Sequence, residues 1–189
     1  VLYVVLAVEE LGLGGSGAGY LNAAFGAGGV AALAATAAFV GRPRLAPPLL
    51  AAALVWTAAF GLLALAPTTV GAFALLALAG AARIAVDVAA RTLLQRSVPP
   101  QSLARMFGIV EAVAMTGLAV GSLLTPALVA LGGARGAVAG LGALLLVASI
   151  ATARRLAAID AHATVPQVEV ALLRTVPMFA PLEAPPLEA

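Results

Sequence analysis

Three ionisable side chains recur at four-residue spacing inside an otherwise apolar stretch. In "ARIAVDVAAR" they are Arg83, Asp87 and Arg91. Residues four apart share one face of a helix, so the three are predicted to form a charged stripe in which Asp87 neutralises either arginine. Charges in hydrocarbon are costly unless they pair or face water. The stripe therefore marks either a gate or proton-coupling site, or a structural ion pair between helices.

Carboxylates in two other apolar runs extend this pattern. Glu111 lies about one and a half turns into the run that follows Arg91, and is expected to reach the depth of Arg83 and pair with it. Glu9 and Glu10 end the first run, where they are either interfacial charges or a substrate or proton site.

Pro126 interrupts the apolar stretch "GSLLTPALVA". Proline leaves a helix carbonyl without its donor and allows bending, so Pro126 is a hinge candidate. Membrane helices also tolerate proline without any such role.

The residue types that enzymes and metal sites need are scarce. The chain has no cysteine, which excludes disulfides and thiolate metal sites, and its single histidine, His162, follows the last apolar run. A hydrolase triad therefore lacks its base. The glycines of "GLGGSG" have the spacing of a dinucleotide fingerprint, but no βαβ unit or ribose-binding acid accompanies them. We predict no enzyme, no metal and no cofactor in this chain.

The composition places the chain in a lipid bilayer. Hydrophobic residues make up 63% of it and charged residues 10%. Abundant Ala and Gly, with only 5% aromatic residues, favour helices packed through small side chains over a barrel. A net charge of +2 is too small to indicate nucleic acid as a partner. The predicted fold class is all-α: a polytopic membrane helix bundle with a short cytoplasmic helical tail.

Six apolar runs follow one another with short breaks. Spanning the hydrocarbon core takes about 20 helical residues. The first run, from Val1 to about Leu11, is shorter and looks truncated, as expected of a fragment. The full runs cover roughly residues 20–40, 48–65, 70–90, 106–131 and 136–153. The breaks "GRPRLAPP", "APTT", "SVPPQS" and "GGARG" carry turn residues.

Arginines fall in alternate breaks, which predicts the orientation. Short cytoplasmic loops retain Lys and Arg. One side of the alternating path receives Arg42, Arg44, Arg91, Arg96, Arg105, Arg154 and Arg155. The other side receives the uncharged "APTT" and the single Arg135 of "GGARG". The tail after Ala153 is therefore predicted to be cytoplasmic.

With this layout, residues 1–156 resemble the carboxyl-terminal half of a major facilitator superfamily transporter, its seventh to twelfth helices. The loop between the eighth and ninth helices carries a shortened basic motif in that family. Gly41, Arg42 and Arg44 match it, although its usual acidic residue is absent. The family's link between the tenth and eleventh helices has a "VP" pair before "R-x-F-G". Here these residues are Val98, Pro99, Arg105, Phe107 and Gly108.

The resemblance implies a mechanism and partners. Two six-helix bundles rock around a central site and expose it to each side in turn. The missing amino-terminal bundle and a small-molecule solute are thus expected partners, beside the lipid of the cell inner (plasma) membrane. Proton-coupled efflux is the candidate mode. One bundle alone is not expected to transport.

The tail carries a second resemblance. "LLRTVPMFAPL" is similar to the first helix and turn of cyclic-nucleotide-binding domains of the catabolite-activator type. It implies a linker over 157–168 and the start of such a domain over 169–189. The packing residues would be Leu172, Leu173, Val176, Phe179 and Leu182. The nucleotide site would lie beyond Ala189, so a cyclic nucleotide is expected to bind only the full-length protein. The alternative is an amphipathic tail helix with proline breaks.

Two functions remain open from the sequence. One is a solute transporter regulated, in its full-length form, by a cyclic-nucleotide-binding domain. The other is a membrane-anchored nucleotide sensor built on a degenerate transporter bundle. An intact amino-terminal bundle would favour the first.

Overall fold

The computed structural model describes residues 2–36, 42, 44–65 and 68–162. Every regular element within these residues is helical, as predicted. In chain order they are α1 (Leu2–Val5), a π-helical turn η1 (Leu6–Glu10), α2 (Gly17–Thr36), α3 (Ala46–Leu65), α4 (Thr69–Ser97) and α5 (Pro100–His162).

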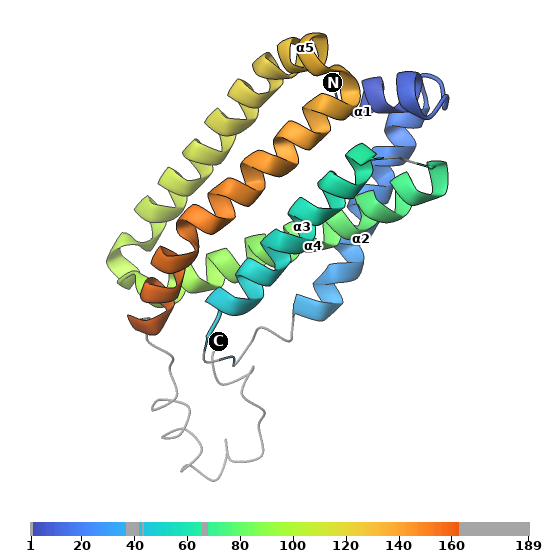
Figure 1. The fold of residues 1–189 in the computed structure, drawn as a ribbon. Coiled ribbons are helices and arrows are strands. Elements are labelled where there is room, and N and C mark those ends of the chain that lie inside the picture. The colour runs from blue at the N-terminus through green and yellow to red at the C-terminus, as the bar shows by residue number, and fades with distance from the viewer. Residues whose placement is uncertain (1, 37–41, 43, 66–67, 163–189) are drawn as a thin grey trace.

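The last element, α5, is two antiparallel arms rather than one straight helix. Gly133 adopts φ 66° and ψ −177°, and the chain reverses there (Figure 1). A positive φ strains residues with a Cβ, so glycine suits this turn. We call residues 100–132 the first arm and 134–162 the second arm. With both arms counted, the described helices correspond to the six predicted runs.

Proline and hydroxyl chemistry explains several helix ends. Val98 is extended at φ −118° and ψ 134°, because a residue before proline is pushed out of the helical region, and this ends α4. Pro100 then opens α5, where its missing N–H costs nothing. The Thr68 hydroxyl caps α4 by accepting a hydrogen bond from the Gly71 N–H at 3.1 Å. The "SVPPQS" break therefore shrinks to two residues between helices.

Three described helices are long and apolar enough to cross a membrane: Ala46–Leu65, Thr69–Ser97 and Pro100–Ala161. The last of these contains both arms of α5. Large apolar side chains are exposed along them, among them Leu62, Leu118, Leu123 and Val147. Such a surface suits a hydrocarbon surround, in which backbone groups are satisfied within each helix.

The helices pack around α4, which contacts α2 on one side and α3 on the other, while α3 also packs on α5 (Figure 1). The buried cluster gathers one or more residues from η1, α2, α3, α4 and the second arm of α5. Its members are Leu6, Ala7, Leu21, Ala59, Phe60, Leu63, Ala72, Leu76, Ala79 and Val138.

Glycines allow α2 and α4 to approach at backbone distance. A Cβ placed on Gly28 would overlap the carbonyl of Ala77, and one on Gly80 would overlap the carbonyl of Phe25. These reciprocal contacts leave no room for a methyl group on either helix. The small residues of α2 are thus used for helix packing, as the sequence predicted.

Replacing Gly28 by Ala is expected to destabilise the chain by about 1–3 kcal/mol, because α2 and α4 must separate to admit the methyl group. The matched control is Gly26→Ala on the same helix, where a Cβ meets nothing within 4 Å. The control should be neutral or stabilising by up to about 1 kcal/mol through helix propensity. The free energy of unfolding in detergent micelles measures both. Equal effects of the two variants would contradict this packing.

Candidate functional site

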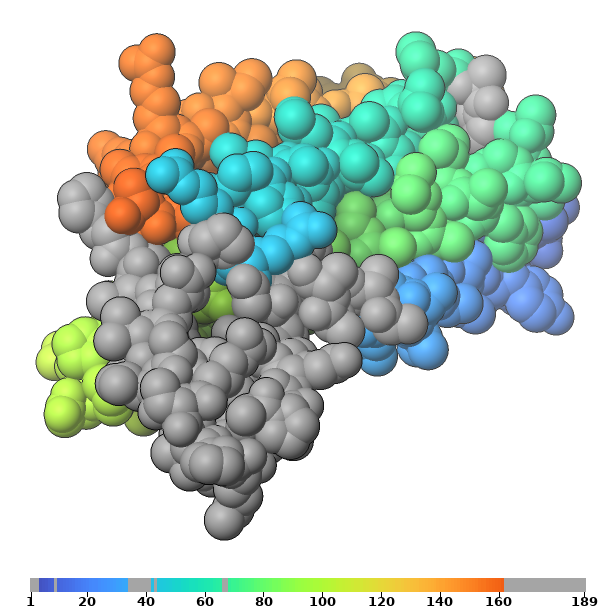
Figure 2. Space-filling model, turned by 90° about the horizontal axis from the view of Figure 1, so that it is seen from below, coloured from blue at the N-terminus to red at the C-terminus, as the bar shows by residue number. Residues whose placement is uncertain are grey.

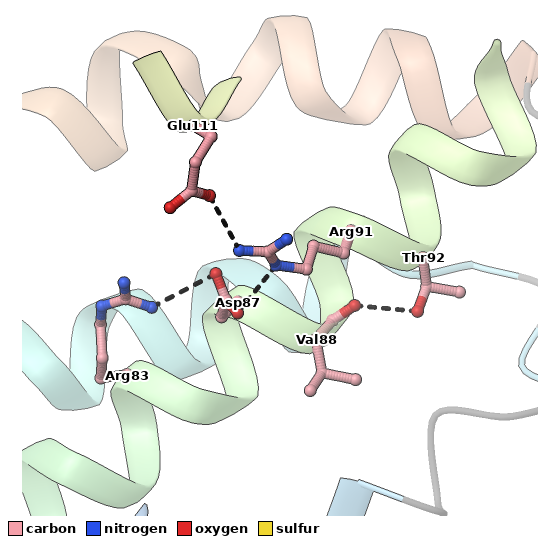
Figure 3. Close-up of polar contacts among 6 residues, drawn as sticks. All are labelled: Arg83, Asp87, Val88, Arg91, Thr92 and Glu111. Carbon is pink, nitrogen blue, oxygen red and sulfur yellow. Dashed lines mark hydrogen bonds and ion pairs between the residues drawn. The ribbon is translucent and has the colours of Figure 1, made fainter. Parts of the chain in front are cut away.

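The predicted stripe on α4 is a continuous chain of ion pairs (Figure 3). The Asp87 carboxylate lies between two guanidinium groups of its own helix. Its Oδ1 is 3.4 Å from Arg83 Nη1, and its Oδ2 is 2.9 Å from Arg91 Nε. One carboxylate thus serves both arginines, as the four-residue spacing indicated.

Glu111 joins this stripe from the first arm of α5, but through a different arginine from the one expected. Its Oε2 lies 3.4 Å from Arg91 Nη2 (Figure 3), and no pair with Arg83 occurs among the described residues. At 1.5 Å per residue, Glu111 is about 16 Å from the start of α5, between the levels of Arg91 and Arg83 on α4. Its depth along the helices therefore does not determine which of the two arginines Glu111 contacts.

Contacts with aromatic rings explain the directions in which the guanidinium groups of Arg83 and Arg91 point. The Arg83 guanidinium lies over the Trp56 ring of α3, 5.6 Å from its centroid. The Arg91 guanidinium lies 6.0 Å from the centroid of Phe107, at the start of α5. Both distances are within the range of cation–π attraction. Arg83 is therefore directed to α3, and Arg91 toward α5.

The four side chains of this ionic network, Arg83, Asp87, Arg91 and Glu111, carry two positive and two negative charges. Their exposed fractions run from 35% at Asp87 to 53% at Glu111. Asp87 has two partners, at 3.4 and 2.9 Å, whereas Glu111 has one, at 3.4 Å. Glu111 is thus held by a single ionic contact, and this contact is the one that joins two helices.

A separate ion pair joins η1 to the second arm of α5. Glu10 Oε2 lies 2.7 Å from Arg135 Nε, just after the turn at Gly133. The sequence places Arg135 on the side opposite most arginines and does not predict its pairing with Glu10. The side chain of Glu9 lies outside the described residues.

At the other end of the bundle, the loop before α3 is bonded to α4. Arg96 Nη1 donates a hydrogen bond of 2.7 Å to the Arg42 carbonyl. Arg42 and Arg44 are exposed, while Gly41 lies outside the described residues. The α2–α3 loop and the end of α4 therefore share one end of the bundle, as the alternating path predicts.

Asp160 is a buried carboxylate that the sequence did not identify. It is 6% exposed and caps α3 from the second arm of α5. Its Oδ1 accepts a hydrogen bond from Leu45 N at 2.9 Å, and its Oδ2 accepts from Ala46 N at 3.1 Å. The sequence predicts a linker over 157–168, and α5 extends through the first part of this range to His162. The partners are 115 residues away, so no local pattern indicates the cap.

A comparison with known families agrees with this helical, charge-bearing architecture. The model of the Major Facilitator Superfamily matches residues 1–182. The chain belongs to the major facilitator superfamily. Members of this family are embedded in lipid and move small solutes, so the chain is a membrane transporter chain. Family membership also suggests that the protein is not an enzyme. Neither a curated protein nor a solved structure matches it.

This major facilitator chain holds an apolar cavity between α3 and both arms of α5. Its volume is about 460 Å³, and Phe60, Leu118, Leu128 and Leu141 are among its lining residues. The hydroxyl of Thr125, also in the lining, donates to its own helix at the Gly121 carbonyl. The ionic network does not line this cavity.

Pro126 lies within the first arm, and the helix continues through it. The non-helical backbone is at Gly133, seven residues further on. The hinge role of Pro126 stays a prediction.

The predicted packing residues of the tail lie outside the residues that the structure describes. These are the tail positions Leu172, Leu173, Val176, Phe179 and Leu182. Within the described residues, no group of three or more His, Cys, Asp or Glu side chains could hold a metal ion.

Replacing Asp160 by Ala should lower the free energy of unfolding by about 1–3 kcal/mol, because two N–H groups at the start of α3 lose their acceptor. Asp160→Asn keeps one oxygen acceptor and should cost less. Denaturant titration followed by fluorescence of Trp56, the single tryptophan, measures both variants. If Asp160→Ala were as stable as the parent chain, the carboxylate would not be holding α3.

Proposed function

We propose that the chain is the carboxyl-terminal six-helix half of a proton-coupled solute exporter of the major facilitator type. In this proposal it lies in a bacterial plasma membrane opposite an amino-terminal half, with its tail in the cytoplasm. The observation that supports it most is the ionic network: Arg91 links a carboxylate of α4 to a carboxylate of α5 between two membrane helices.

Glu111 is the proposed proton acceptor of this network. Asp87 is held by two arginines, and one of these contacts is the short 2.9 Å bond to Arg91. Glu111 has a single ionic contact and the most exposed side chain of the four. A proton on Glu111 removes its negative charge and with it the attraction to Arg91. Asp87 then remains the partner of both Arg83 and Arg91, so the network carries a net charge of +1 while Arg91 keeps its 2.9 Å contact with Asp87.

The proposed consequence is a movement of the first arm of α5 relative to α4. Among the described residues, Arg91–Glu111 is the ion pair that joins these two helices. The second arm is attached independently, through Asp160 at α3 and Arg135 at Glu10. Protonation would therefore release one arm of α5 and leave the other in place.

The competing interpretation is that the network only holds the helices together. Substitution of Glu111 would then lower stability without changing how the site opens. Accessibility measured as a function of pH separates the two interpretations.

Glu111→Gln, which mimics the protonated carboxyl, is expected to abolish a pH-dependent change in exposure of the first arm. Because these 189 residues contain no cysteine, Ser122→Cys supplies the one reporter thiol of this chain, in an intact transporter whose other cysteines are replaced. Maleimide labelling of this thiol, normalised to the denatured protein at each pH because the thiolate is the reactive form, should change as the pH is lowered. Loss of an exposed ion pair changes the equilibrium between the attached and released positions of the first arm by up to about fivefold.

His162→Gln is the matched control, since His162 is the single histidine of the chain and histidine is the residue type that commonly responds to pH. This variant should keep the full pH dependence. A Glu111→Gln protein whose labelling still followed pH as in the parent, with only its stability reduced, would leave the network a structural role.

We further propose that a cyclic-nucleotide-binding domain follows the membrane bundle and regulates it. The support is the sequence "LLRTVPMFAPL" at the end of the chain. The major facilitator match runs through residue 182 and so includes this segment. The alternative, a nucleotide sensor anchored by a degenerate bundle, predicts nucleotide binding without transport.

This 189-residue chain is expected not to bind cyclic AMP, whereas the full-length protein should bind it. Isothermal titration calorimetry of both in detergent tests this prediction. Binding by the full-length protein, together with solute transport in proteoliposomes that responds to cyclic AMP, would favour regulation. Binding without transport would favour the sensor. A full-length protein that bound none would contradict both.

A further inference from the structure

The loop that precedes α3 is bonded from two sides by segments distant in the sequence. Arg96, 54 residues further along, donates to the Arg42 carbonyl at 2.7 Å. Asp160, 115 residues from Leu45, accepts from Leu45 N at 2.9 Å. These contacts bring the loop, the end of α4 and the end of α5 to one end of the bundle. Figure 2 views the molecule from this end, with the start of α3 beside the end of α5.

Four exposed arginines belong to the segments joined here, and we call them the arginine rim: Arg42, Arg44, Arg154 and Arg155. Arg42 and Arg44 lie in the bonded loop. Arg154 and Arg155 precede Asp160 by six and five residues on α5, about 8–9 Å along the helix axis. The two pairs thus approach each other because Asp160 is attached to α3.

The rim has no acidic counterpart among the described residues. The nearest carboxylate, Asp160, is buried, and both of its oxygens accept backbone N–H groups of Leu45 and Ala46. The ion pairs among the described residues involve Arg83, Arg91 and Arg135 and none of the rim. Within the described part of the chain, no carboxylate therefore compensates these four positive charges.

We propose that the arginine rim binds the phosphate groups of anionic phospholipids in the adjoining membrane leaflet. In a membrane transporter the ends of the helices lie at the level of the headgroups. Guanidinium groups match phosphate oxygens in geometry and charge. Next to the rim, apolar side chains of the second arm such as Val147 and Ile150 are exposed, as contact with acyl chains requires. A basic cluster beside a membrane helix attracts anionic lipid. The proposal depends on membrane embedding and not on the solute or the coupling ion.

The test is a lipid titration of the purified chain in detergent micelles, read by native mass spectrometry. Phosphatidylglycerol is the anionic probe and phosphatidylcholine the zwitterionic one. Phosphatidylglycerol is expected to bind more tightly, and its advantage should shrink at high salt because exposed charges are screened. Replacing Arg44, Arg154 and Arg155 by Gln should weaken phosphatidylglycerol binding by about fivefold for each arginine, with phosphatidylcholine binding unchanged.

Arg135→Gln is the matched control, because it removes an equally exposed arginine charge at the opposite end of the bundle. It should leave phosphatidylglycerol binding unchanged, and replacement of the three rim arginines by Lys should preserve most of it. Equal binding of the two lipids, or full binding by the Gln variant, would overturn the proposal. So would displacement of the lipid by millimolar inorganic phosphate, which would identify a site for a soluble anion. If the Gln variant does not fold, the ratio of the two lipids at low and high salt decides.

Discussion

A charge placed among apolar helices must find an opposite charge or water, and this constraint determines how α4 meets its neighbours. Arg83, Asp87 and Arg91 stand on one face of a helix that is otherwise almost entirely apolar. Asp87 satisfies part of the requirement within α4, and Glu111 satisfies the rest from α5. The same contacts that make the bundle stable thus place two carboxylates around one arginine. In the function proposed above, the same four side chains hold the two helices together and respond to a proton.

The ends of the helices are subject to a second constraint, because their terminal backbone groups need partners. α4 meets it locally, through the hydroxyl of Thr68. α3 meets it through Asp160, which is distant in the sequence and attached to another helix. A single cap therefore stabilises α3 and also fixes where α5 ends. That placement brings exposed arginines together at one end of the membrane bundle, opposite the Glu10–Arg135 pair.

Much of the architecture followed from short-range patterns. Apolar runs located the helices, and proline and glycine located most of the breaks. The spacing of Arg83, Asp87 and Arg91 predicted their mutual pairing, since residues four apart on a helix must be neighbours. Prediction was weaker wherever two elements meet. Glu111 was assigned to Arg83 from depth alone, but the rings of Trp56 and Phe107 direct the two arginines differently. The linker is expected to begin at residue 157, whereas α5 continues to His162 and Asp160, within this extension, caps α3.

The sequence by itself determined the class of the protein, since hydrocarbon-compatible runs of helical length admit few alternatives to a membrane bundle. It also determined the charged stripe, whose members lie within one helical turn or two of each other. The tertiary structure decided which helices share those charges, how closely α2 and α4 approach at Gly28 and Gly80, and which residue caps α3. The physical reason is range. Helix periodicity acts over four residues, whereas crossing angles and side-chain directions between helices depend on the packing of the whole bundle.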